Sequence, residues 1–351
     1  MPKNRIAITY TTKTGGAAKG FLEFLKAREN LTLMLLITCD WEYSRINYIK
    51  SRVNALLTRI LQFLLFKEYV KCSLNYFPVV DLSKFDHSKI YIGWVGNGMI
   101  NLKNNPLTEY IVRFSDEWWL NDIQHYKLNK KLYFPSILEQ KIDFLNKKNV
   151  TLIFPSSWLQ RSFISIVGGK KLECETLVIR NVASNDFFNK PKGNIRRLYF
   201  IASKLSDPNK GFDILKDNLN LLKSYFEEIL VIGSHRYMKK IKGLHFLGHL
   251  KAEDLARRYK EGGVYLHLAK RDNSPNSLIE ACSSGLIPIV MGGSGAQEYV
   301  EDVDFKVPLI LDPNGELTAQ IDQILSELNS CAHQELEDLA LEVQRNIRRI
   351  C

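Results

Sequence analysis

The chain has 351 residues, of which 45% are hydrophobic and 25% charged, and its formal net charge is +10. This length favours two domains over one, and the composition is that of an ordinary globular protein rather than a disordered or fibrous one. No run of about 18 apolar residues occurs, so no membrane-spanning helix is predicted, and the N-terminal stretch MPKNRIAITY lacks the apolar core of a secretion signal.

The distribution of charged residues and of cysteines indicates the kind of partner and the redox compartment. Residues 1–183 contain 26 Lys and Arg against 15 Asp and Glu, whereas residues 184–351 contain 22 against 23. A basic first half indicates an anionic partner such as a membrane surface, a phosphorylated substrate or nucleic acid, and the alternative is a lysine-rich solvated surface. The six cysteines are scattered without a CxxC pair, which favours reduced thiols in the cytoplasm over disulfides or a zinc site.

Apolar runs and helical patterns alternate along the first half. Strands are predicted at 5–11, 31–39, 89–96, 110–115, 150–156 and 177–182, and helices at 15–29 and 158–167. Short apolar runs between helices of ten or more residues imply a parallel sheet covered on both faces. Residues 183–194, ASNDFFNKPKGN, have the composition of a linker.

The second half alternates more regularly. Strands are predicted at 196–203, 228–233, 263–269, 286–291 and 307–311, and helices at 210–226, 251–262, 275–284 and 318–329. We therefore predict an α/β protein of two facing Rossmann-like, doubly wound parallel-sheet domains, residues 1–183 and 184–330. Residues 331–351 are predicted to form a last helix that packs back toward the first domain.

Ligands of open parallel sheets bind at the carboxyl ends of the strands, so the loops that follow the strands are the places to search. In the segment DNSPNSLIEACSSG, Ser274 is a good N-cap, Pro275 suits the first helical position and Gly285 is placed to end the helix. The free amides at the start of such a helix form an anion site.

Two acidic residues lie at or near the N-terminal end of this predicted helix. Glu280 lies four residues after Asn276 and three after Ser277, so the three share a face, and helical side chains lean toward the N-terminus. Asp272 precedes the helix at the same mouth, and either carboxylate suits a hydroxyl ligand. The alternative is that Glu280 pairs structurally and Asp272 is a solvated loop residue.

A second loop carries cations. In KLSDPNKG, Lys204 and Lys210 lie on either side of a turn after the strand 196–203, an arrangement that suits a diphosphate. The alternative is a pair of exposed loop lysines. The sequence MGGSG at 291–295 follows another strand, where glycine lets the backbone approach a ligand closely.

These motifs resemble a known family. SDPNKGFDIL, FLGHLKAEDLARRYKEGGVYLHLA, DNSPNSLIEACSSGLIPIV and GGSGAQEYV resemble the carboxyl-terminal half of the family-4 (group 1) retaining glycosyltransferases of the GT-B fold, of the bacterial polysaccharide-biosynthesis type. GGAAKG, IGWVGNGMINL, VRFSDEWWLNDIQHY and LIFPSSWLQRSF resemble its amino-terminal half in matching order, so the resemblance covers nearly the whole chain.

The resemblance implies roles for the second half. Glu280 corresponds to the second acid of the family's E-x7-E motif, which binds the ribose, and Asp272 takes the first position, usually Glu, which meets the donor sugar. Lys210 corresponds to the diphosphate-binding lysine, and Lys204 stands where the family commonly has Arg, so it keeps the charge but loses the bidentate fork.

The resemblance also implies that backbone meets the nucleotide and the sugar. Gly233 and Gly248 fall where backbone meets the base, and Gly15 and Gly16 resemble a loop that approaches the sugar or phosphate. Asp116 matches the family's His-Asp pair, in which Ser115 here replaces the histidine.

The expected reaction is transfer of a hexosyl unit, with anomeric retention, from a nucleoside diphosphate sugar to a glycan or lipid-linked acceptor in cell-surface polysaccharide synthesis. The lysines and the Ser274–Ser277 amides would stabilise the leaving diphosphate without a metal or other cofactor. The expected location is the cytoplasm or the inner face of the plasma membrane, where the segment 44–71 would meet anionic lipid. The alternative for that segment is a helix packed on its own sheet.

Rival functions stay open. One is a nucleotide-sugar epimerase on the same fold, and another is a non-catalytic nucleotide-sugar binder, which the departures at Ser115 and Asp272 favour. A nicotinamide dehydrogenase is weaker, because TGGAAKG lacks the G-x-G-x-x-G spacing. No nucleic-acid partner is expected, since only the charge favours one.

Overall fold

The structure is a computed structural model of the chain. It describes residues 5–10, 33–37, 80–81, 89–94, 100–101, 105–114, 142–167, 172–234 and 241–351. Two compact units are present, one formed by Met1–Pro155 with Leu159–Ile179 and the other by Ser156–Trp158 with Arg180–Cys351. The linker predicted at 183–194 lies just after the third crossing between the units, at 179–180.

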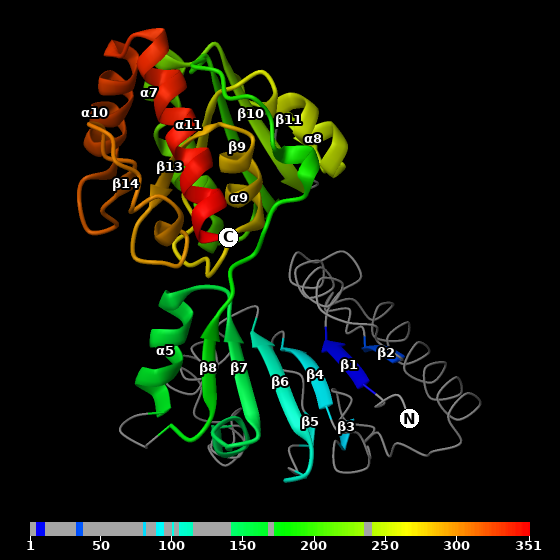
Figure 1. Cartoon of the computed structure of the whole chain (residues 1–351). Helices are drawn as coiled ribbons and strands as arrows, with labels where there is room; N and C mark the ends of the chain where they lie inside the picture. Colours follow the sequence, from blue (N-terminus) through cyan, green and yellow to red (C-terminus); the bar gives the residue numbers. More distant parts are fainter. Residues whose placement is uncertain are drawn as a thin grey trace. The chain divides into compact units, whose positions relative to one another are not determined.

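The first unit is built on a six-stranded sheet in the order β2-β1-β4-β6-β7-β8, in which every neighbouring pair is parallel (Figure 1). The strands are β1 (Arg5–Tyr10), β2 (Leu33–Ile37), β4 (Lys89–Trp94), β6 (Glu109–Phe114), β7 (Val150–Phe154) and β8 (Glu175–Val178). Two short strands, β3 (Val80–Asp81) and β5 (Ile100–Asn101), pair separately. Helix α5 (Ser157–Val167) covers the sheet through Phe163, whose ring lies 5.8 Å from Phe114 and 5.5 Å from Phe154.

The second unit is built on another six-stranded parallel sheet, in the order β11-β10-β9-β12-β13-β14. Its strands are β9 (Arg197–Lys204), β10 (Glu228–Ser234), β11 (His245–Gly248), β12 (Val264–His267), β13 (Ile287–Met291) and β14 (Ile310–Leu311). Its helices are α6 (Phe212–Asp217), α7 (Leu219–Tyr225), α8 (Ala252–Tyr259), α9 (Asn276–Ser283), α10 (Leu317–Ser330) and α11 (His333–Ile350), with short 3-10 turns η2 (Asn185–Phe187), η3 (Pro208–Lys210) and η4 (Gln297–Tyr299). The predicted α/β class with Rossmann-like parallel sheets is confirmed.

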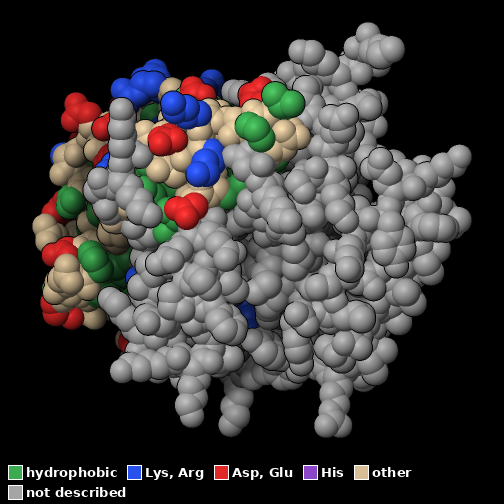
Figure 2. All heavy atoms as spheres, turned by 90° about the horizontal axis from the view of Figure 1, so that it is seen from below, with side chains coloured by type: hydrophobic (Ala, Val, Ile, Leu, Met, Phe, Trp, Pro, Cys, Tyr) green, Lys and Arg blue, Asp and Glu red, His purple; other side chains and the backbone are tan. Residues whose placement is uncertain are grey.

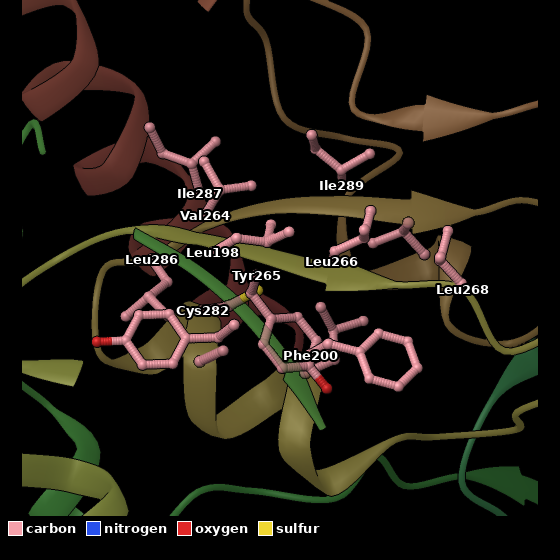
Figure 3. Close-up of a cluster of buried hydrophobic side chains, with 14 of the residues drawn as sticks. Leu198, Phe200, Val264, Tyr265, Leu266, Leu268, Cys282, Leu286, Ile287 and Ile289 are labelled. Carbon is pink, nitrogen blue, oxygen red and sulfur yellow. The ribbon is translucent and has the colours of Figure 1, made fainter. Parts of the chain in front are cut away.

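The apolar runs form strands because both faces of this sheet are covered. Every residue of β12 and of β13 is buried, as expected for parallel strands between two helical layers. Figure 3 shows the side chains that fill this core, from β9, β12, β13 and the end of α9. The labelled ones are Leu198, Phe200, Val264, Tyr265, Leu266, Leu268, Cys282, Leu286, Ile287 and Ile289.

One predicted element divides in two. The helix expected across 210–226 is broken at Asn218, which ends α6 and begins α7. The Asn218 side chain donates to the Ile214 carbonyl at 2.9 Å, and such a local side-chain bond competes with continuation of the helix. The helix expected at 15–29 lies outside the described residues.

The C-terminal helix belongs to the second unit. Its predicted packing toward the first domain stays a prediction. Helix α11 packs on α9, β13 and η4. Its buried Gln344 donates to the Asn189 carbonyl at 2.8 Å and to the Ser283 carbonyl at 2.6 Å, and Asn346 donates to the Tyr299 carbonyl at 3.0 Å. The last helix therefore supports the back of α9.

Candidate functional site

The strand order of the second sheet reverses between β9 and β12. β9 pairs with β10 on one side and with β12 on the other, so the loops after β9 and β12 leave the same edge in different directions. Such a switch point is where open parallel sheets hold their ligands. Lys204 is the last residue of β9 and is exposed at this edge.

The loop after β9 is shaped to reach β12. The Asp207 side chain accepts from the Asn209 amide at 3.0 Å, and Pro208 begins the turn η3. Gly211 follows with φ +72°, and a Cβ there would lie 2.2 Å from the Leu268 carbonyl oxygen, so only glycine permits this approach. The Asn209 carbonyl accepts from the Lys270 amide at 2.9 Å, which ties the loop after β9 to the loop after β12.

Two residues predicted for the site form an ion pair between these two loops. The Lys210 Nζ lies 3.0 Å from the Asp272 Oδ2, and the side chains are 28% and 19% exposed. The Asp272 backbone is also held, because its carbonyl accepts from the Ala296 amide at 3.1 Å. A cation and an acid therefore lie together, within reach of solvent, at the switch point.

A third titratable group, which the sequence analysis missed, lies beneath this pair. His267 is the last residue of β12, is 5% exposed, and has its Nε2 4.0 Å from the Asp272 Oδ2. Burial lowers the pKa of His267 to about 4, with Asp272 opposing the shift and Lys210 adding to it, so the ring is neutral near pH 7. Its Nε2 has no hydrogen-bond partner within the described part of the chain. The sequence feature that could have identified His267 is the place of this histidine inside the apolar run VYLHLA.

The start of α9 differs from the prediction. Pro275 is the N-cap residue, the helix begins at Asn276, and Ser274 makes no capping bond. The Ser274 hydroxyl instead lies 2.6 Å from the hydroxyl of Tyr299, which is fully buried and requires a polar partner. The predicted end is confirmed: Gly285, at φ +79°, donates to Cys282, as in a Schellman motif.

The polar face of α9 meets its neighbours through two bonds. The Ser277 hydroxyl accepts from the Tyr265 hydroxyl at 2.8 Å, and the Asn276 side-chain oxygen accepts from Asn181 at 3.0 Å. Glu280 follows on this face and is partly exposed. The structure thus places Asn276, Ser277 and Glu280 along one helix that begins shortly after Asp272.

Backbone conformation and close contacts within the fold explain why glycine occupies these positions. Gly233 has φ +137°, and a Cβ there would meet the Ala202 carbonyl oxygen of β9 at 1.7 Å. Gly248 ends β11 at φ +67°. Gly295, in the loop after β13, would bring a Cβ to 2.1 Å from the Asn273 carbonyl oxygen, so this glycine loop supports the backbone next to Asp272.

Another buried carboxylate was missed by the sequence analysis. Glu298 in η4 is 5% exposed and accepts from the Ser157 amide at 2.9 Å, from the Trp158 amide at 2.5 Å and from the Arg180 guanidinium at 3.1 Å. All four residues belong to the second unit. The first amides of a helix are a favourable place for negative charge, so Glu298 caps the amides of Ser157 and Trp158.

Other predicted features lie outside the described residues or away from the switch point. Gly15, Gly16 and Asp116 are not among the described residues, and neither is the segment 44–71. The sequence contains an Asp-x-Asp, at 302–304, in an exposed loop where Asp302 pairs with Arg349 at 3.5 Å. No cluster of His, Cys, Asp and Glu suited to a metal occurs among the residues whose positions are described. None of the helices in those same ranges is long and apolar enough to cross a membrane.

Comparisons with known proteins agree with this geometry. Residues 196–327 match the sequence model of the family "Glycosyl transferases group 1". The whole chain is similar in structure to sucrose-phosphate synthase from Thermosynechococcus elongatus, with 13% identity, a TM-score of 0.66, and coverage of 99% of this chain and 95% of that one. No curated protein matches by sequence.

Two further solved structures are similar over nearly their whole length. HepE of Anabaena, in complex with UDP-glucose, has 14% identity and a TM-score of 0.62 over 99% of this chain and 95% of that one. WaaG, a glycosyltransferase involved in lipopolysaccharide biosynthesis, has 12% identity and a TM-score of 0.61 over 98% and 95%. At these identities the structural likeness establishes the fold alone.

Proposed function

We propose, from the premise that residues 196–327 form a group 1 glycosyltransferase domain in a chain of the GT-B fold, that this protein moves a hexosyl unit from a nucleoside diphosphate sugar to a glycan or lipid-linked acceptor, with anomeric retention. The observation that carries the proposal is the 3.0 Å ion pair between Lys210 and Asp272 at the strand switch point. A diphosphate requires a cation, and a sugar hydroxyl requires an acceptor.

In this proposal Lys210 moves from the Asp272 carboxylate onto the donor diphosphate. Lys204, at the end of β9, and the backbone amides of Ser274, Asn276 and Ser277 at the start of α9 provide further positive potential, whereas Pro275 has no N–H to donate. The leaving diphosphate gains negative charge in the transition state, and these fixed donors stabilise it in place of a metal ion. Removing one such donor costs about 2.7–4 kcal/mol of barrier.

The remaining donor contacts follow from the resemblance and from the placement of the side chains. Asp272 accepts a hydroxyl of the donor sugar, Glu280 binds the ribose, and the backbone at Gly233 and Gly248 meets the base. The complex of HepE with UDP-glucose supports a nucleotide sugar as the ligand. A uridine or a guanosine nucleotide is compatible with these roles.

The acceptor is assigned to the basic first half, with Gly15, Gly16 and Asp116 reaching the sugar or phosphate. Figure 2 shows basic and acidic side chains interspersed on the described part of one face. By sequence the charge excess lies in the 1–183 half, which favours an anionic glycan, lipid-linked acceptor or membrane surface there. WaaG, whose description names lipopolysaccharide biosynthesis, supports a role in cell-surface polysaccharide synthesis on the cytoplasmic side.

The test is calorimetric binding of UDP and GDP, followed by turnover of their sugars. Lys210→Ala should weaken binding of the diphosphate and lower turnover roughly 100-fold or more, while the control Lys260→Ala, at an exposed lysine after α8, should leave both unchanged. Near-normal kinetics for Lys210→Ala would overturn the assignment. Release of the nucleotide from the sugar separates a transferase from a binder, and a changed sugar without an acceptor reveals an epimerase.

A further inference from the structure

The Asp272 carboxylate has two candidate partners on the same oxygen. Its Oδ2 lies 3.0 Å from the Lys210 Nζ and 4.0 Å from the His267 Nε2. The first distance is a charge-assisted hydrogen bond, and the second is about 1 Å too long for one. The pair with Lys210 is therefore made in this structure, whereas the bond to His267 is only approached.

Burial of the His267 side chain costs free energy unless its Nε2 forms a hydrogen bond. The residue ends a strand whose four residues are all buried, and an apolar side chain would satisfy that position without desolvating a polar group. In the described ranges its Nε2 makes no hydrogen bond, which is unusual for a buried side-chain nitrogen. The one carboxylate that the ion-pair geometry brings to this nitrogen is Asp272.

The His267 ring packs on a neighbouring ring, and the Asp272 backbone is tied to the loop after β13. His267 stacks on Tyr265 with ring planes 17° apart, and the Tyr265 hydroxyl is bonded to Ser277. The Asp272 backbone is bonded through its carbonyl to the Ala296 amide, so a change of partner requires only rotation of the Asp272 side chain.

We propose that His267 is a positioning residue for Asp272, which exchanges Lys210 for His267 when Lys210 moves onto the donor diphosphate. This inference rests on the proposed function, because it assigns Lys210 to a phosphate. The neutral imidazole carries its proton on Nε2 and donates it to Oδ2 in a hydrogen bond, so no proton is transferred and the net charge of the pair is unchanged. The bond fixes the other oxygen, Oδ1, toward a hydroxyl of the donor sugar.

The exchange also stabilises the Asp272 carboxylate after Lys210 has moved to the diphosphate. A diphosphate that attracts Lys210 leaves the Asp272 carboxylate without its cation, next to an incoming anion. A hydrogen bond from a neutral donor stabilises that carboxylate without competing with Lys210 for the phosphate. With an apolar residue at 267, the carboxylate would turn away from the diphosphate toward solvent and leave the sugar.

The test follows the His267 Nε2–H group by NMR in the full chain labelled with 15N-histidine, with the signal assigned by its loss in His267→Gln. Lys210→Ala frees Asp272 without any nucleotide, so this variant should show a protected Nε2–H resonance shifted downfield. UDP added to the wild-type protein should produce the same shift, and the double variant Lys210→Ala/Asp272→Asn should lose it. Identical spectra for the single and the double variant would overturn the partner exchange.

A kinetic comparison separates positioning from a structural role. His267→Gln retains an N–H donor and should keep turnover of the nucleotide sugar within about threefold, whereas His267→Leu should lower turnover more than tenfold and weaken UDP binding by a smaller factor. Melting temperatures of both variants control for folding. Equal turnover in the two variants would refute the assignment. If UDP does not bind the wild-type protein, the proposed function fails, while the Lys210→Ala spectra still decide the role of His267.

Discussion

In the proposed function Asp272 competes with the donor diphosphate for Lys210, so Asp272→Asn is expected to tighten the binding of UDP while it impairs sugar transfer. At 3.0 Å the Coulomb attraction between the two charges is about 5.5 kcal/mol at an effective dielectric constant of 20. Desolvation and side-chain ordering offset most of this in a partly exposed pair, which leaves about 1 kcal/mol. The variant also removes a negative charge next to the phosphates.

The expected gain in UDP affinity is therefore about fivefold to tenfold, since each 1.4 kcal/mol corresponds to a factor of ten. Isothermal titration calorimetry with UDP at low salt measures it, and Asp272→Glu, which keeps the charge, is the matched control. The gain should shrink as salt is added, because screening weakens the pair in the wild-type protein. Unchanged or weaker UDP binding by Asp272→Asn, with the fold intact, would refute the competition.

Three further predictions concern stability. Gly211→Ala should lower the free energy of unfolding in urea by at least about 2 kcal/mol, because strain and a clash combine. Gly293→Ala, at φ +78° with only an ordinary contact to Pro313 Cγ at 3.6 Å, should cost only about 1 kcal/mol; equal losses would contradict this. Glu298→Gln should cost about 1–3 kcal/mol by the same assay, since it weakens the bonds to two amides and to Arg180, and an unchanged midpoint would contradict it. Because the folded-state pKa of His267 is lowered from 6.5 to about 4, the unfolded chain binds a proton there first and stability falls as the pH drops from 6.5 toward 4; His267→Gln should lose less stability over that window, and an identical pH dependence would exclude this group as a cause.

The fold of the second unit was predictable because its signals are local and repeated. Apolar runs such as 263–269 and 286–291 became the buried strands β12 and β13, and residue type together with strand order was enough to bring Lys210 and Asp272 to one edge. The proximity of the cation and the acid could be predicted from sequence because each lies in the loop that follows a strand, and the ends of parallel strands meet at one edge.

Other features depended on contacts that sequence spacing does not encode. Ser274 is a residue type that commonly caps helices, yet its hydroxyl instead pairs with the buried hydroxyl of Tyr299, 25 residues away. Asn218 interrupts a helical period because its own side chain bonds back to the backbone. His267 looked like part of an apolar strand, and only the three-dimensional approach of Asp272 distinguishes it from a core residue.

The support that α11 gives to α9 determines where the protein can be cut. The similarity to the group 1 family ends at residue 327, but Leu339, Val343 and Ile347 are buried against the same core, and Gln344 anchors the end of α9. A fragment trimmed to the recognised segment would expose that apolar surface to water and leave the Ser283 carbonyl without this donor. The eighteen residues of α11 thus complete the core behind α9, and an excised second unit should need the chain from Arg180 through Ile350 to stay folded.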